Sequence, residues 1–208
     1  MRTSHSTLRG LSRISPWVLS TMLPLCAGCV TYEEEEQRVT IDEERNIARH
    51  TDTYFDIGSD QSTAEEQGED FSDLIDMWKG DETLLSGADN GTYVLSRKVW
   101  LEGGKLKGEM QWLERGAKVF HDQSDWRSDS LGYWRKLDPR EVDLVRTNGT
   151  VTRTDTTLIV QWPPSAREIL IRERSRDFAP TPSFADSFRA YLRNQKIGLK
   201  QLRLRGAR

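Results

Sequence analysis

The chain has 208 residues, with 30 Lys and Arg against 33 Asp and Glu, and a formal net charge of −3. Nucleic-acid binding depends on clustered positive charge, so this slightly acidic balance excludes nucleic acid from the expected partners. The two cysteines, Cys26 and Cys29, both lie near the N-terminus. A disulfide framework or a Cys-based metal site further along the chain is therefore excluded as well.

The N-terminal segment has the pattern of an export signal. The charged residues before its apolar run are all positive: Arg2, Arg9 and Arg13. The apolar run, Trp17 to Leu25, is far shorter than the roughly 20 residues that span a bilayer. A positive start, a short apolar run and small residues before a cleavage point predict a signal peptide at residues 1–28. An ordinary secretory signal and a buried N-terminal helix in a cytosolic protein are the alternatives.

The ending Ala27-Gly28-Cys29 resembles the lipobox of bacterial lipoproteins, a resemblance that covers residues 1–29 only. It implies cleavage before Cys29 and attachment of palmitate-type acyl chains to that residue. The lipobox usually has Leu where Cys26 stands, which leaves the cleavage site open. By the same resemblance, Val30 after the cysteine implies sorting to the outer membrane, facing the periplasm. Two or three acyl chains hold a protein on a membrane far more firmly than one chain does.

An acidic segment, residues 29–61, follows the signal. From Cys29 to Gly80 there are sixteen Asp and Glu against four Lys and Arg, and the acids begin with Glu33 to Glu36. A polar stretch of this kind buries too little surface to offset its chain entropy, so the sequence predicts a disordered, extended tether. A calcium site is the alternative, but the segment lacks the spaced Asp/Asn and Gly loop of such sites.

Two amphipathic helices are predicted in residues 62–208. The first follows a capping box of Ser62 and Glu65, and the second follows Pro182 with Ser183 as its cap. Each has an apolar stripe at helical spacing, which indicates packing against a core. The stripes are Phe71, Leu74, Ile75 and Trp78, and then Phe184, Phe188, Tyr191 and Leu192.

The region Thr92 to Leu113 predicts a β-hairpin, because Gly103-Gly104 supplies the positive φ of a two-residue turn. Pairing about this turn gives one apolar face and one face of complementary charges, as in a half-buried antiparallel sheet. The expected pairs are Leu101–Leu106, Val99–Gly108, Leu95–Trp112, Arg97–Met110, Lys98–Glu109, Glu102–Lys105, Ser96–Gln111 and Trp100–Lys107.

A second β region runs from Asp143 to Arg174, with turns at Asn148-Gly149, near Asp155-Thr156 and at residues 163–166. A meander of three or four strands is expected. It would pair Val151 with Val160, Leu158 with Ile171, and Val160 with Ile169.

Residues 114–142 have little readable pattern, except that Asp138 to Glu141 predicts the first turn of a short helix with Pro139 at its entry. The tail, Lys196 to Arg208, alternates Leu with basic residues. This pattern predicts a final edge strand, since Lys and Arg protect edges from mispairing, or a patch for a membrane surface.

The sequence contains no motif for a phosphate loop, a dinucleotide, a nucleophile elbow or a zinc protease, so no catalytic residue and no cofactor are predicted. His121 with Asp122 and Asp125 matches no metal-ligand spacing and is interpreted as a solvated loop. Three tryptophans are candidate contacts for a partner or a ligand, because they fall on a solvent face or near a loop: Trp100, Trp126 and Trp134. A satellite cluster covering the sheet is the alternative for them.

The sequence thus predicts one periplasmic α+β domain at residues 62–208: an antiparallel sheet of about five or six strands, a hairpin plus a meander, with an N-terminal and a C-terminal helix packed on it. The expected function is that of a membrane-anchored envelope lipoprotein with a non-catalytic docking or structural role and an envelope protein as partner. The alternative is a periplasmic carrier or chaperone that binds lipid or another apolar ligand in a sheet-plus-helix cavity. Outer-membrane lipoprotein receptors that handle lipid resemble it in expected architecture alone. A cell-wall hydrolase ranks last.

Overall fold

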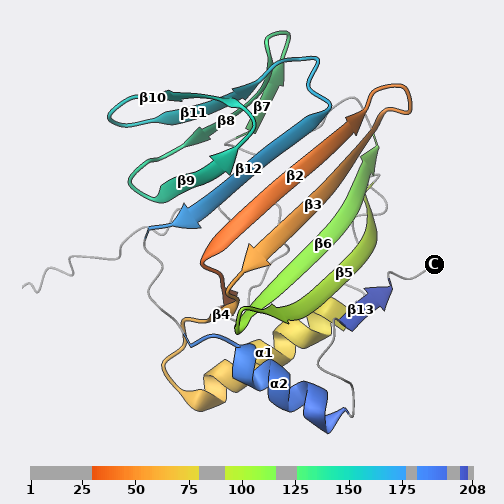
Figure 1. Cartoon of the computed structure of the whole chain (residues 1–208), viewed down its shortest axis with the longest axis vertical. Coiled ribbons are helices and arrows are strands. Elements are labelled where there is room, and N and C mark those ends of the chain that lie inside the picture. Colours follow the sequence, from red (N-terminus) through yellow and green to blue (C-terminus); the bar gives the residue numbers. More distant parts are fainter. Residues whose placement is uncertain (1–29, 80–91, 116–125, 177–181, 196–201, 206–208) are drawn as a thin grey trace, which may run out of the picture.

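The computed structural model of the chain describes residues 30–79, 92–115, 126–176, 182–195 and 202–205 (Figure 1). The predicted signal peptide, Cys29, and the group His121, Asp122 and Asp125 lie outside these ranges. In chain order the elements are β1 (Val30–Thr31), β2 (Glu34–Asp42), β3 (Ile47–Phe55), β4 (Gly58–Ser59), α1 (Ala64–Lys79), β5 (Thr92–Glu102), β6 (Lys105–Arg115), β7 (Trp126–Asp129), β8 (Gly132–Leu137), β9 (Val142–Thr147), β10 (Thr150–Arg153), β11 (Leu158–Trp162), β12 (Glu168–Ser175), α2 (Ala185–Asn194) and β13 (Leu202–Arg205).

The strands form three antiparallel sheets. The largest has the order β13-β5-β6-β3-β2-β12-β9, the second has the order β10-β11-β8-β7, and β1 pairs with β4. A mainly antiparallel α+β fold is thereby confirmed. The main sheet, with seven strands, is larger than the predicted five or six, and α1 follows four strands instead of opening the domain.

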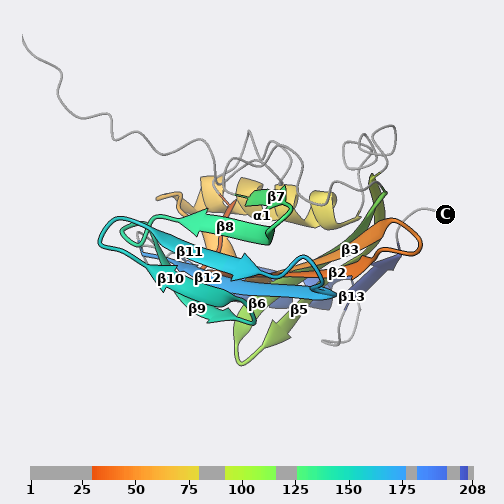
Figure 2. The ribbon, with the colours of Figure 1, turned by 90° about the horizontal axis from the view of Figure 1, so that it is seen from above.

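The seven-stranded sheet has one covered face, called here the inner face. On β2 the inner face carries Glu35, Gln37, Val39 and Ile41, and the outer face carries the residues between them. Figure 2 shows the four-stranded sheet and α1 on the same side of the large sheet. Each covers a different end of it, so two apolar clusters form on the inner face.

The first cluster lies between the two sheets. The large sheet contributes Val39, Ile41, Ala48, Ile169 and Ile171, and the four-stranded sheet contributes Trp126, Leu137, Leu158, Val160 and Trp162. The second lies under the helices. Its buried members include Leu74, Ile75 and Trp78 from α1, Phe188 and Leu192 from α2, and Tyr54, Val99 and Leu106 from the sheet. Both helical stripes are thus confirmed as core-facing. Among the described residues, no helix is long and apolar enough to cross a membrane.

The helix caps differ from the prediction by one residue each. At α1 the capping box is formed by Thr63 and Glu66: Glu66 N donates to Thr63 Oγ1 at 3.2 Å, and Thr63 Oγ1 donates to Glu66 Oε2 at 2.7 Å. At α2 the N-cap is Phe184, without a side-chain hydrogen bond, and Ser183 accepts a bond from Ala185 N at 3.3 Å.

The prediction of a disordered tether over residues 29–61 is wrong. In that range, β2 and β3 are nine-residue strands at the middle of the large sheet, and β2 lies between β3 and β12. The carboxylate of Glu34 is buried on the outer face, where Arg172 Nε donates to it at 2.6 Å and Arg174 Nε at 2.9 Å. The buried carboxylate of Glu34 is therefore tolerated because strand β12 supplies its counter-charges.

The hairpin prediction is confirmed for β5 and β6. Gly103 and Gly104 have φ values of 60° and 84°, and seven of the eight predicted pairs have the observed register, including Val99 opposite Gly108. The eighth is wrong, because a bulge between Val94 and Ser96 places Val94 opposite Trp112 and leaves Leu95 exposed.

The predicted meander is confirmed only in part. Val151 pairs with Val160 as expected. Strand β11 pairs with β8 and not with β12, so Val160 meets Ile169 and Ile171 across the space between two sheets and not along one sheet.

Two further predictions concern the chain around these strands. The segment 138–141 is a turn and not a helix: the backbone amides of Glu141 and Val142 both donate to the Asp138 carbonyl, at 3.0 and 3.1 Å. The edge-strand prediction for the tail is confirmed at residues 202–205, where β13 pairs with β5.

Candidate functional site

A row of polar residues crosses the inner face between the two apolar clusters. Register places Gln37, Asp52, Met110 and Arg97 opposite one another on β2, β3, β6 and β5, and all but Met110 are polar. Asp52 and Arg97 are 7% and 4% exposed. Buried ionisable groups in the middle of a sheet are costly unless they are paired, so this row is the first candidate site.

Asp52 is the acid of this row, and its pKa is strongly shifted. Burial, together with the nearby charge of Glu35, raises the pKa of its carboxyl to about 7, although a hydrogen bond from Trp112 and the charge of Arg135 act in the opposite direction. Trp112 Nε1 donates to Asp52 Oδ2 at 2.9 Å. The imidazole of His50 stacks on the Trp112 indole, with ring centroids 3.7 Å apart. Asp52 therefore exchanges its proton near neutral pH, in a setting fixed by an aromatic stack.

A second group of side chains joins the two sheets. Glu35 accepts hydrogen bonds from Gln37 Nε2 at 2.9 Å and from the Tyr32 hydroxyl at 3.0 Å. Arg135, on β8, donates to Gln37 Oε1 at 2.7 Å and to Glu173 Oε2 at 3.1 Å. Burial, with the charge of Glu35, raises the pKa of Tyr32 well above its ordinary value. These groups satisfy one another, so they hold the four-stranded sheet in position over the large one.

Arg97 ends the row on β5 and differs from the other members. No acid among the described residues pairs with it, its Nε has no hydrogen-bond partner, and burial lowers the pKa of its guanidinium. Met110, the opposite residue on β6, is also buried but belongs to neither apolar cluster.

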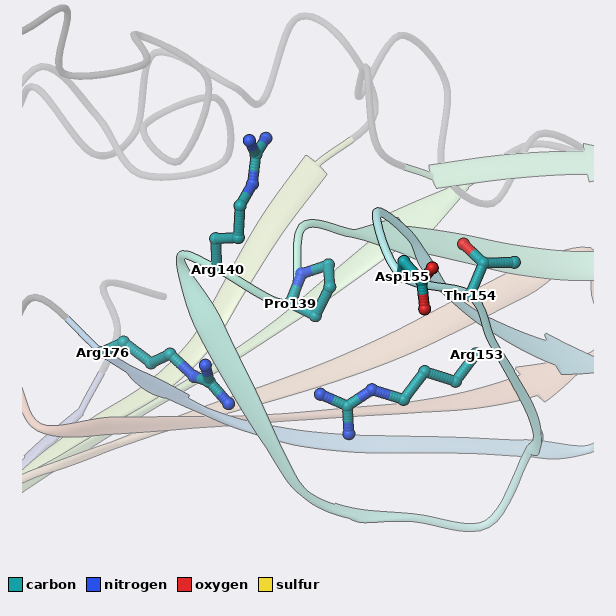
Figure 3. A pocket seen from close by; sticks show the side chains of 6 residues that line it. All are labelled: Pro139, Arg140, Arg153, Thr154, Asp155 and Arg176. Atoms are coloured by element: carbon teal, nitrogen blue, oxygen red, sulfur yellow. The ribbon is translucent and has the colours of Figure 1, made fainter.

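A separate depression of about 570 Å³ lies at the far end of the molecule (Figure 3). The β8–β9 turn, the β10–β11 turn and the end of β12 form it, and Arg140, Arg153 and Arg176 are among its lining residues. Figure 3 shows the guanidinium groups of Arg153 and Arg176 pointing toward each other. Three cations around one depression are suited to a small anion.

Two of these three arginines already have counter-charges. Arg140 donates to Asp138 through Nε at 3.0 Å and lowers the pKa of that carboxyl to about 2. Arg176 Nε donates to Asp143 at 2.8 Å. Among the described residues only Arg153 lacks an ion pair here, so the attraction of the depression for an anion is essentially that of one exposed guanidinium.

The three candidate tryptophans lie in three different layers. Trp100 is half-buried on the outer face of the large sheet, where its Nε1 donates to Glu102 at 3.1 Å. Trp134 lies on the outer side of the four-stranded sheet, beside Arg127. Trp126 is 4% exposed and stacks on Trp162 inside the first apolar cluster. The interpretation of Trp126 as a surface contact is wrong, because alternation along β7 turns it inward.

Sequence reasoning missed the polar row because its members come from four strands, two of them in the supposed tether. Period-two alternation in residues 35–41, which runs Glu35, Gln37, Val39 and Ile41, was the available signal. In the described ranges, no three His, Cys, Asp or Glu side chains gather in a way that could hold a metal ion. Comparisons with protein-family models, with curated proteins and with solved structures gave no match to this chain.

Proposed function

We propose that this chain is a lipoprotein of the bacterial cell envelope, anchored through Cys29 to the periplasmic side of the outer membrane, whose domain docks onto another envelope protein. The lipobox-like ending Ala27-Gly28-Cys29 supports the anchor. The position of β1 adds to the proposal, since this strand begins at Val30 and pairs with β4. Acyl chains on residue 29 would then hold the domain directly at the bilayer surface, and its partner would be a protein that also lies there.

The observation that carries the docking function is the outer face of the seven-stranded sheet. Among the described residues, no helix and no further sheet covers it (Figures 1 and 2). Its side chains are fixed in place: the Lys107 ammonium lies 4.7 Å from the centre of the Phe55 ring, and the Arg172 guanidinium lies 3.8 Å from the same ring. Trp100 sits opposite Lys107 on this face. A rigid, half-exposed indole is the kind of residue that dominates protein interfaces.

Crosslinking in living cells tests the docking surface. A photo-reactive amino acid is placed at Trp100 and, as a matched control, at Trp134 on the opposite side of the molecule. We expect one discrete adduct from position 100 and none from position 134. No adduct from position 100, or equal adducts from both positions, would contradict docking through this face.

Acyl labelling tests the anchor. Cys29→Ser should abolish incorporation of an alkyne-labelled palmitate in a bacterium that processes lipoproteins, and should release the protein from the membrane fraction. Cys26→Ser is the matched control and should retain the label. Label that persists in Cys29→Ser would show that the anchor is assigned to the wrong residue.

A carrier of an amphiphilic ligand is the second candidate. The observation in its favour is that the helices and the four-stranded sheet cover the same face, while Arg97 and Met110 lie between the two clusters and belong to neither. Native mass spectrometry of the protein released from bacterial membranes should then reveal a bound small molecule. Repeated spectra of the ligand-free mass alone would dismiss the carrier function.

A further inference from the structure

The outer face of the large sheet carries two cations that the chain itself does not neutralise. In the described strands of this sheet, each Asp or Glu that faces outward forms an ion pair, as Glu109 does with Lys98. Arg49 and Arg115 are exposed on the same face and form no ion pair with any described residue. The charge left over on these strands is therefore positive, and it lies on exposed side chains.

The two arginines are neighbours on the face. Register places Arg49 opposite Leu113 and Ile47 opposite Arg115 on β3 and β6, so the two arginines occupy diagonal positions of one antiparallel pair. Diagonal neighbours lie about 7 to 8 Å apart, which is within reach of long side chains. Two guanidinium groups at this spacing repel each other, and a carboxylate from outside would bind both and remove the repulsion.

Apolar side chains lie directly beside these cations. Tyr93 is opposite Leu113 on the outer face, and the guanidinium of Arg115 lies 5.6 Å from the centre of the Tyr93 ring. Tyr93 is 43% exposed, which is unusually high for a large apolar side chain in the middle of a strand pair. We call Arg49, Arg115, Tyr93 and Leu113 the basic corner. It offers positive charge and an exposed aromatic ring to the same neighbour, the combination that protein interfaces use.

We propose that the envelope protein that docks onto the outer face presents an acidic segment to the basic corner, with carboxylates on Arg49 and Arg115 and an apolar side chain against Tyr93. This inference rests on the docking function and names the chemistry of its partner. Trp100 lies seven positions further along β5, about 20 Å away at 3.3 Å per residue, so one interface of ordinary size covers both. Charge complementarity of this kind selects the partner and its orientation.

Crosslinking from the corner itself tests the chemistry of the partner. A photo-reactive phenylalanine derivative replaces Tyr93 in the full chain in living bacteria, and the crosslinked partner peptide is sequenced by mass spectrometry. We expect a segment with a clear excess of Asp and Glu over Lys and Arg. A neutral or basic segment would overturn the proposal. So would an adduct of twice the mass of the chain, because the occupant would then be a second copy.

Charge reversal connects the partner to the two arginines. Arg49→Glu combined with Arg115→Glu should lower the yield of the adduct from position 100 about tenfold or more, because like charges would then face each other. The matched control is Arg127→Glu with Lys136→Glu, which makes the same change in net charge at exposed positions of the four-stranded sheet and should leave the yield unchanged. An unchanged yield in the first variant, or an equal loss in both, would overturn the proposal.

Two further measurements keep these results interpretable. All four substituted positions are exposed, so both double variants should unfold at the urea concentration of the wild type, which shows that a lost adduct is not a lost fold. Arg49→Lys combined with Arg115→Lys keeps the charge without the planar fork, and it should retain a reduced yield. A yield as low as that of the charge-reversed variant would show that positive charge is not what the partner recognises, and would overturn the proposal.

Failure of this inference and failure of the docking function give different results. If position 100 gives its adduct and the yield does not respond to Arg49→Glu with Arg115→Glu, docking holds and the acidic partner is wrong. If position 93 is crosslinked to an acidic segment while position 100 gives no adduct, the basic corner is a binding site and docking through Trp100 is wrong.

Discussion

Asp52→Asn is expected to stabilise the protein at alkaline pH and to have little effect at pH 4. The carboxyl of Asp52 is buried on β3, where burial raises its pKa from 3.8 to about 7. In the unfolded chain this group ionises above about pH 4, while in the folded protein it keeps its proton until about pH 7. The folded state thus binds more protons, so stability falls as the pH rises from 4 to 7 and is then constant with respect to this group.

The size of the effect follows from the shift. About three pKa units correspond to about 4 kcal/mol, at 1.36 kcal/mol for each unit. Asn removes this cost, and its side-chain oxygen still accepts the bond that Trp112 Nε1 donates to Asp52 at 2.9 Å. The new amide group has donors beside Glu35, and one left without a partner costs about 1 kcal/mol. The net gain for Asp52→Asn is therefore about 3 kcal/mol at pH 8.5.

Urea unfolding at pH 4.5, 6 and 8.5 measures this gain, with Asp73→Asn on the exposed side of α1 as the matched control. The stability of Asp52→Asn relative to the wild type should increase as the pH rises from 4.5 to 8.5, while Asp73→Asn should follow the wild type at each pH. If the wild type and Asp52→Asn show the same dependence on pH, the buried carboxyl is not the cause and the reasoning is refuted.

Two further substitutions test the packing and the ion pairs of the large sheet. Gly108→Ala should lower the free energy of unfolding in urea by about 1 to 3 kcal/mol, because the new Cβ would lie 2.5 Å from Trp78 Cζ2. Adding Trp78→Phe should recover part of this loss. Equal losses in the single and the double variant would contradict the contact. Glu34→Gln should lower the free energy of unfolding by about 2 kcal/mol at pH 7. Burial raises the pKa of Glu34, but the hydrogen bonds from Arg174 and Arg172 outweigh it and lower this pKa, so the carboxylate stabilises the fold. This loss should shrink as the pH falls below about 4, because protonation then removes the negative charge of Glu34 in the wild type as well. A loss that is independent of pH would exclude the ion pairs as its cause.

Local patterns predicted those elements whose partners are near in sequence. The β5–β6 hairpin was predictable in register because Gly103-Gly104 fixes the turn and both faces of the pair can be compared directly. The α1 stripe was predictable for the same reason, since Leu74, Ile75 and Trp78 lie within two turns of one helix. The bulge at Leu95 was not, because an apolar residue in regular alternation gives no sign of it.

Patterns whose meaning depends on distant partners were misread. Glu33 to Glu36 looked like a solvated acidic run, but Arg172 and Arg174 neutralise Glu34 from 138 and 140 residues away. The same limit applies to β11 and β12, which are neighbours in sequence and lie in different sheets. Alternation shows that Val160 and Ile171 face a core, but it does not show whether they share one sheet.

The placement of β2 between β3 and β12 has a consequence for how the chain is made. Strand β3 follows β2 after four residues, so these two strands can pair as soon as they are synthesised. The opposite edge of β2 stays unpaired until β12, which begins at Glu168, has been synthesised. Until then the backbone donors and acceptors of this edge can pair with strands of other chains. Pairings between such distant segments slow folding. A chain that ends before residue 168 therefore exposes the unpaired edge of β2, which favours aggregation. Such a chain would need a chaperone to stay in solution.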